Sequence, residues 1–238
     1  MTIKNQLRKL ANVFGIDVLR LHQSPQQTLL GLRSLPIGTV IDCGANVGQF
    51  GRAISNVFPA ARLYCFEPLE APYNQLAVWA KTQQGRVQCF NLALGDEEGE
   101  IEMHRHDGHS PSSSLLASTA HGNEIYPQTT AESFVKVHLT TLDKALERHL
   151  ADMPKDILLK LDVQGFEDRV LRGATRVLSE CVACVLEVCL DPLYEGQADF
   201  FDLSCLLNDA GYRYAGNLEQ VYADDGRVIY LDAVFLKR

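Results

Sequence analysis

The stretch Val40-Ile41-Asp42-Cys43-Gly44-Ala45-Asn46-Val47-Gly48-Gln49-Phe50-Gly51 decides the fold of this chain. Apolar residues lead into it as in a buried strand, and Asp42 follows where that strand ends. Gly44 and Gly48 permit the backbone conformations of a tight turn, and apolar residues of 48–58 recur at the spacing of one helix face. A strand, a glycine turn and a helix are typical of open α/β sheets, which bind nucleotide-like ligands at the carboxyl ends of their strands.

The spacing of the glycines separates two kinds of ligand. A dinucleotide-binding turn has the order G-x-G-x-x-G, whereas here the glycines fall at 44, 48 and 51 and Asn46 takes the middle place. The pattern Asp-x-Gly-x-Asn-x-Gly resembles instead the first motif of S-adenosylmethionine-dependent methyltransferases. S-adenosylmethionine carries a sulfonium and an ammonium in place of a pyrophosphate, and a strand-end carboxylate suits these cations. An NAD-dependent oxidoreductase is therefore the less favoured interpretation.

Two further strand ends extend this binding edge. Glu67 ends the strand predicted over 61–67, 25 residues after Asp42, and an acidic residue at about this spacing commonly binds ribose hydroxyls. Pro68 cannot continue a central strand, so it marks the strand end. A third strand, over 86–94, ends in Asn91-Leu92-Ala93-Leu94-Gly95, where Leu92 or Leu94 is placed to contact an adenine ring.

The fourth and fifth strands supply candidate catalytic residues. Lys160 and Asp162, two residues apart near the end of a strand over 156–162, share one face. Since isolated buried charge is costly, this pair is either a structural ion pair or a functional one, in which Asp162 orients or deprotonates an acceptor hydroxyl. Glu187 is the sole charge within the apolar strand over 182–190 and is the second candidate base.

The predicted cofactor site therefore joins residues from four strand ends. We expect the cofactor to contact Asp42, Gly44, Asn46, Gly48, Glu67, Pro68, Asn91, Ala93, Leu94 and Asp162.

Residues 105–133 interrupt the alternation of strands and helices. They are rich in Ser, Thr, His, Gly and Pro and show little periodicity. A stretch of this length inside a compact domain is typical of a functional loop or lid. Within it, Ser112-Ser113-Ser114 is placed either to contact an acceptor or to form part of a flexible polar loop.

Two sets of residues raise the question of a metal, and we predict no metal ligands. Histidines of loops are more often solvated than bound to metal. A magnesium ion at carboxylates of the fourth and fifth strand ends is an alternative that the sequence leaves open without favouring it. The two sets are His104, His106 and His109, and Asp162, Glu187 and Asp191.

Composition and charge agree with one globular α/β domain. The chain has 238 residues, 46% hydrophobic content and a net charge of −8, values of an ordinary globular protein. The acidic balance argues against nucleic acid as the main partner. A polar start without a signal-peptide core, seven cysteines of which six lie in or beside predicted strands and no apolar run of membrane-spanning length lead us to expect a cytoplasmic protein without a membrane span.

The order of predicted elements defines the expected architecture. Residues 1–37 form an N-terminal helical segment, with an amphipathic helix around Leu7 to Phe14, and residues 38–238 form a single domain that contains the 105–133 loop. The strands over 212–222 and 228–236 read as an antiparallel pair across an Asp-Gly turn. We therefore predict an α/β, doubly wound, Rossmann-like sheet of the class I methyltransferase type, mostly parallel with an antiparallel C-terminal strand.

Taken together, the motifs resemble those of the FkbM-type methyltransferases. The resemblance rests on Val40 to Gly48, Phe66-Glu67-Pro68, Asn91 to Asp96, Ser112 to Leu115, Thr141-Leu142-Asp143, Leu159 to Glu167 and Val170 to Ala174, in the family's order. It implies a class I fold, S-adenosylmethionine as methyl donor and O-methylation of a hydroxyl on a sugar or polyketide-type molecule, small or part of a glycan. The non-catalytic alternative is a domain that binds S-adenosylmethionine but has lost the chemistry.

One residue departs from the family pattern. Many members carry glutamate where this chain has Gln164. An amide cannot act as an acid or a base, so the change affects any such role at this position and leaves cofactor binding intact. The identity of the acceptor and the oligomeric state are not readable from the sequence.

Overall fold

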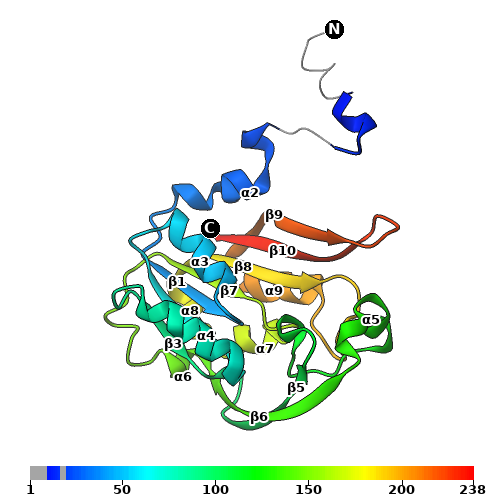
Figure 1. Cartoon of the computed structure of the whole chain (residues 1–238). Coiled ribbons are helices and arrows are strands. Elements are labelled where there is room, and N and C mark those ends of the chain that lie inside the picture. Colours follow the sequence, from blue (N-terminus) through cyan, green and yellow to red (C-terminus); the bar gives the residue numbers. More distant parts are fainter. Residues whose placement is uncertain (1–9, 17–19) are drawn as a thin grey trace.

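The computed structural model describes residues 10–16 and 20–238 and is built on a seven-stranded sheet (Figure 1). The strand order is β3-β2-β1-β7-β8-β10-β9. Numbered within this sheet alone, the order is 3-2-1-4-5-7-6, and it reverses between β1 and β7. The strands are β1 Thr39–Cys43, β2 Arg62–Phe66, β3 Val87–Phe90, β7 Ile157–Leu161, β8 Cys181–Cys189, β9 Tyr212–Tyr222 and β10 Val228–Lys237.

The strand directions confirm the predicted class I methyltransferase sheet. β3, β2, β1, β7 and β8 run parallel, and β10 pairs antiparallel with both β8 and β9. The carboxyl ends of the parallel strands therefore meet along one edge, and the reversal between β1 and β7 opens a crevice there.

Helices cover both faces of this sheet. Successive side chains of each strand point to opposite faces, and the apolar strands therefore present apolar side chains on both. Ile41 and Leu159 pack on the face covered by α6, α7, α8 and α9, and Val40 and Leu158 pack on the face covered by α3, α4 and the 3-10 turn η2. The helices are α2 Pro25–Thr28, α3 Gln49–Val57, α4 Glu70–Lys81, α5 Ala120–Ile125, α6 Leu142–Ala145, α7 Glu167–Arg172, α8 Thr175–Glu180 and α9 Phe200–Asp209, with 3-10 turns η1 Leu21–Gln23, η2 Leu29–Ser34, η3 Ser110–Ser112 and η4 Pro127–Thr129.

The predicted third strand is wrong in its extent, because it divides into two strands of different sheets. β3 ends at Phe90, and β4 Ala93–Gly95 joins β5 Gly99–His106 and β6 Glu132–Thr141 in a small second sheet of order β4-β6-β5. Between them, the Asn91 side chain donates to the carbonyls of Glu67 and Pro68, at 2.9 and 2.8 Å. These hydrogen bonds tie the link between β3 and β4 to the segment that follows β2.

The single helix predicted after the fourth strand is also divided. α7 ends at Arg172 and α8 begins at Thr175. Gly173 lies so close to β4 that a Cβ there would come within 2.0 Å of the Gly95 carbonyl oxygen. α7 therefore ends where its backbone meets β4.

The segment 105–133 is ordered into short elements. It contains η3, α5 and η4, and it is joined to its surroundings by the bridges His104–Ser114 and Ser118–Tyr194. The helix predicted around Leu7 to Phe14 lies partly outside the described residues, and residues 10–13 are helical. Among the described helices, none combines the length and apolar character that a bilayer span needs.

Candidate active site

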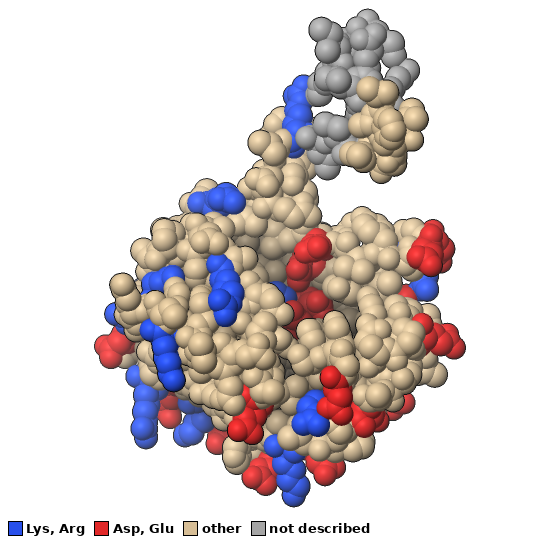
Figure 2. Space-filling view, in the orientation of Figure 1, with Lys and Arg blue, Asp and Glu red and all other residues tan. Residues whose placement is uncertain are grey.

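A cavity of about 320 Å³ opens at the carboxyl ends of β1, β2, β7 and β8. In the space-filling view, acidic side chains lie in the hollow of this face (Figure 2). The cavity brings together eight of the ten predicted cofactor residues and both candidate bases. These are Asp42, Gly44, Asn46, Glu67, Pro68, Ala93, Leu94, Asp162 and Glu187, with Asp162 counted in both groups.

The turn after β1 passes directly against the end of β7. Gly44 has φ +80°, and a Cβ on it would lie 1.8 Å from the Asp162 carbonyl oxygen, so only glycine fits. Asn46 has φ +46°, in the left-handed region that asparagine tolerates better than most residues. This explains how asparagine takes the middle place of the motif.

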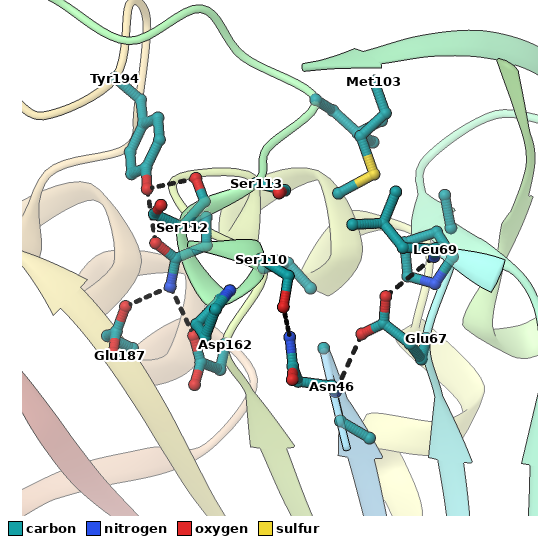
Figure 3. Close-up of a pocket in the computed structure, with 18 of the residues that line it drawn as sticks. Asn46, Glu67, Leu69, Met103, Ser110, Ser112, Ser113, Asp162, Glu187 and Tyr194 are labelled. Atoms are coloured by element: carbon teal, nitrogen blue, oxygen red, sulfur yellow. Dashed lines mark hydrogen bonds between the residues drawn. The ribbon is translucent and has the colours of Figure 1, made fainter. Parts of the chain in front are cut away.

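Glu67 shapes the wall next to this turn. It is 5% exposed, and its two carboxylate oxygens accept hydrogen bonds from the backbone amides of Asn46 at 2.9 Å and Leu69 at 2.8 Å (Figure 3). Burial raises the pKa of Glu67 to about 7 despite these hydrogen bonds. Two predicted cofactor residues, Asn91 and Gly48, do not line the cavity. The Asn91 side chain donates hydrogen bonds to the backbone carbonyls of Glu67 and Pro68, and Gly48 packs against the side chains of Leu76 and Trp79.

Asp42 is a buried carboxylate without a hydrogen-bond partner. It is 1% exposed, and neither side-chain oxygen has a partner among the described residues. Burial raises its pKa to about 7, and the nearby Lys160 counteracts part of this effect. An orphaned carboxylate facing a cavity is suited to a cationic ligand, since burial without a partner is costly.

Lys160 lies between two carboxylates at the centre of the site. Its Nζ is 3.4 Å from Asp162 Oδ2 and 3.2 Å from Asp232 Oδ1, and the residue is 4% exposed. These neighbours, with Glu187 and Asp42 farther away, outweigh burial and raise the pKa of Lys160. The ion pair inferred from the sequence is therefore present, and Asp232 is a second partner that the sequence did not reveal.

Gln164 connects the two candidate bases. Its amide Nε2 donates to Asp162 Oδ1 at 2.7 Å and to Glu187 Oε1 at 2.6 Å, and its Oε1 lies 2.6 Å from the hydroxyl of Tyr194 (Figure 3). Burial and the adjacent Asp162 hold the pKa of Glu187 well above its usual range. The site thus contains a bridged pair of carboxylates.

Comparison with known proteins decides the family of this chain. The model of the methyltransferase FkbM domain matches residues 42–214. The chain belongs to the FkbM methyltransferase family. Relatives include the 2-O-methyltransferase NoeI of Sinorhizobium fredii, 26% identical over 83% of this chain and 81% of the relative. Methyltransferase 1 of Beauveria bassiana is 26% identical over 74% and 72% of the two chains, and methyltransferase sdnD of Sordaria araneosa 25% over 64% and 66%.

This FkbM-family protein is an S-adenosylmethionine-dependent methyltransferase and not a dinucleotide enzyme. Its cavity fits that cofactor. The orphaned oxygens of Asp42 suit the cationic part, and the glycine at 44 leaves the backbone bare at the turn. Leu92, Leu94 and Met103 give one end of the cavity an apolar lining that suits an adenine ring.

Several lining residues were missed in the sequence. Asp232 carried the same signal as Glu187, a single acidic residue between apolar neighbours in a strand, and the two lie opposite each other on β10 and β8. The others had no local signal, since they come from separate loops, turns and strands that the fold brings to the crevice. They are Leu69, Met103, Ser110, Tyr126, Tyr194 and Tyr230. His109, one of the histidines considered above as metal ligands, also lines the cavity.

The Ser112–Ser114 run is engaged in internal hydrogen bonds. Ser112 Oγ lies 3.1 Å from Nδ1 of both His106 and His109, and Ser114 Oγ donates to the Gln164 carbonyl oxygen at 2.6 Å. Of the run, Ser112 and Ser113 line the cavity.

The two metal-like sets do not converge. His104 contacts Glu132, and His106 and His109 contact Ser112. Asp191 pairs with Arg227 and His121, while Asp162 and Glu187 share the Gln164 amide. Over the described ranges, no three His, Cys, Asp or Glu side chains are grouped so that they could hold a metal ion.

Proposed function

We propose that this protein transfers a methyl group from S-adenosylmethionine to a hydroxyl group of an uncharged sugar- or polyketide-type acceptor. The observation that carries the proposal is the environment of the Glu187 carboxylate. This group is half-buried on the cavity wall, with a raised pKa and with one oxygen held by Gln164. A general base needs a higher proton affinity than that of an exposed carboxylate, and its position should be fixed.

The cofactor end of the cavity is formed by β1, β2 and the 92–94 segment. Asp42 would face the cationic part of the cofactor, and Glu67 would reach the ribose. Pro68, Ala93 and Leu94 would pack on the adenosine, with the turn from Gly44 to Asn46 beneath it. Bound S-adenosylmethionine supplies an electrophilic methyl group, and the protein's task is to align the acceptor oxygen with it.

Glu187 is better placed than Asp162 to take the acceptor proton. Both oxygens of Asp162 are engaged, one by the Gln164 amide and the other by Lys160. Glu187 Oε1 accepts from Gln164, and no hydrogen bond from the described residues reaches its Oε2. Asp162 would then orient the acceptor hydroxyl while Glu187 removes its proton.

The charges at the acceptor end favour an uncharged acceptor. Asp162, Glu187 and Asp232 line this end with Lys160 as their cationic neighbour. A phosphate or carboxylate on the acceptor would be repelled by the excess of carboxylates. Tyr126 and Tyr230 offer hydroxyls and ring faces of the kind that bind neutral polyols or aromatic rings. The relative NoeI is described as a 2-O-methyltransferase, which supports oxygen as the methylated atom.

A comparison of Glu187→Gln with the wild type tests this proposal. Radiolabelled methyl transfer is measured on a panel of neutral glycosides and phenols and on their phosphorylated forms, with binding of S-adenosylhomocysteine measured in parallel. We expect transfer to neutral compounds alone, a loss of about 10²–10⁴-fold in Glu187→Gln and unchanged cofactor binding. Glu180→Gln, an exposed change on α8, serves as control. Transfer at the wild-type rate by Glu187→Gln contradicts the base, and a preference for phosphorylated acceptors contradicts the acceptor class.

A further inference from the structure

The amide of Gln164 lies where two carboxylates approach each other. Its Nε2 is 2.7 Å from Asp162 Oδ1 and 2.6 Å from Glu187 Oε1. A primary amide has two N–H donors on one nitrogen, so it can serve both carboxylates at once. Two carboxylates held so close repel each other unless a proton, a cation or N–H donors lie between them.

The surroundings fix the direction of this amide. The Tyr194 hydroxyl lies 2.6 Å from Gln164 Oε1, so the amide oxygen points to the tyrosine and the nitrogen to the carboxylates. The backbone is fixed as well: Gln164 has φ +56°, and its carbonyl oxygen accepts a hydrogen bond from Ser114 at 2.6 Å. A non-glycine residue keeps such a strained backbone conformation only when the contacts around it enforce it.

We infer that Gln164 is a positioning residue whose two amide N–H groups hold Asp162 and Glu187 together in the place that a divalent cation bridging the two carboxylates would take. The neutral amide of Gln164, and not a bound cation, thereby keeps the two carboxylates close to each other. The inference rests on the proposed function in treating this pair as the acid/base machinery, but its geometry is independent of the acceptor.

A specific consequence separates this role from ordinary loop stabilisation. Replacing the amide with a carboxylate of the same shape puts a third negative charge between Asp162 and Glu187. Three carboxylates are the oxygen ligands that hard divalent cations prefer. We call the Gln164 amide with the two carboxylates that it holds, Asp162 and Glu187, the clamp. Gln164→Glu should therefore turn the clamp into a cation site. If Gln164 only supported the loop, the same change would lower the stability of the protein without raising its affinity for a metal.

The experiment is calorimetric titration of the metal-free full-length protein with MnCl₂ at pH 7.5. We expect Gln164→Glu to bind one Mn²⁺ per chain about tenfold or more tightly than the wild type, and Mn²⁺ to raise its melting temperature. The gain should disappear in Gln164→Glu/Glu187→Gln. Gln88→Glu adds the same charge at an exposed site on β3 and should behave as the wild type. Equal Mn²⁺ binding by wild type and Gln164→Glu, or a gain that survives Glu187→Gln, overturns the inference.

A second variant keeps the inference testable if Gln164→Glu does not fold. Gln164→Met keeps the length of the side chain without its N–H donors. The titration of Glu187 is followed by NMR of ¹³C-labelled glutamate side chains and assigned with Glu187→Gln. The charged groups that face Glu187 are Asp162 and Lys160 at the end of β7, Asp232 on β10 and Glu167 on α7. Because these stay in place, loss of the N–H donor should move the titration of Glu187 to higher pH, and an unchanged titration contradicts the clamp.

Neither readout depends on methyl transfer. If no acceptor is methylated but the metal and titration results are as expected, the proposed function fails and the clamp stands. If the metal and titration results are negative while Glu187→Gln still abolishes transfer, the clamp fails and the proposed function stands.

Discussion

Glu187 and Asp232 lie directly opposite each other on the antiparallel strands β8 and β10, and both side chains line the cavity. Like charges facing each other across a sheet are normally destabilising. Lys160, from the neighbouring strand β7, compensates by lying 3.2 Å from Asp232, while Gln164 donates to Glu187. The sheet therefore holds an acidic centre whose stability depends on one buried lysine.

Removal of that lysine should be costly. In Lys160→Met, Asp162 and Asp232 lose their cationic partner and remain only partly hydrated, with 32% and 27% of their side chains exposed. We expect the free energy of unfolding in urea to fall by about 3 kcal/mol, the low end for breaking a buried pair. In Lys155→Met, which breaks an exposed pair with Glu180, the loss should stay below about 1 kcal/mol. Equal losses in the two variants would contradict the role of Lys160.

Asp42 should make the unliganded protein less stable as the pH rises. Its pKa is raised to about 7 from 3.8, chiefly by burial, while Lys160 lowers it and Asp162 raises it. Between these values the folded state binds more protons than the unfolded state, so the contribution of Asp42 is complete below pH 4 and is lost as the pH rises through 7. In Asp42→Asn this dependence is absent.

Denaturation at pH 5 and pH 8 measures the effect. We expect the stability of Asp42→Asn relative to the wild type to be greater at pH 8 than at pH 5, because any packing cost of the amide is the same at both. The same variant should bind S-adenosylhomocysteine more weakly. Asp96→Asn, on an exposed turn, is the control. A difference between variant and wild type that is independent of pH would argue that Asp42 is ionised throughout.

Asn91 should support cofactor binding from outside the cavity. In Asn91→Ala the carbonyls of Glu67 and Pro68 lose hydrogen bonds of 2.9 and 2.8 Å, each worth about 1 kcal/mol. The wall that carries Glu67 should loosen, and affinity for S-adenosylhomocysteine in calorimetry should fall by about fivefold to tenfold. Asn56→Ala removes an exposed contact to the Arg52 carbonyl and should leave affinity unchanged. Wild-type affinity of Asn91→Ala for S-adenosylhomocysteine would contradict a role of Asn91 in cofactor binding.

The sequence predicted the parts of the site that follow from local pattern. Asp42, Glu67, Asp162 and Glu187 were recognisable because each is an acidic residue at the end of, or within, an apolar strand. Asp232 shows the same pattern but was overlooked, because its strand was read only as half of the closing hairpin.

The remaining features depend on contacts between distant segments. The split of the third strand falls at Asn91, whose side chain bonds to the segment after β2, and the Gln164 side chain contacts Glu187 and Tyr194, which lie 23 and 30 residues away in the chain. Local periodicity carries no information about such contacts, so an apparently minor departure from the family motif became interpretable only in the folded protein.

Calorimetric titration with S-adenosylhomocysteine, comparing Gly44→Ala with Gly85→Ala, tests the central claim most directly. Both glycines have nearly the same conformation, φ +80° and +79°, so both variants have a similar backbone penalty of about 1 kcal/mol. At Gly44 the new Cβ would meet the Asp162 carbonyl oxygen at 1.8 Å, whereas at Gly85 it meets nothing within 4 Å. We predict that wild type and Gly85→Ala bind alike and that Gly44→Ala binds about 100-fold more weakly. Equal binding by all three proteins, or by none, would contradict the placement of the cofactor at this turn.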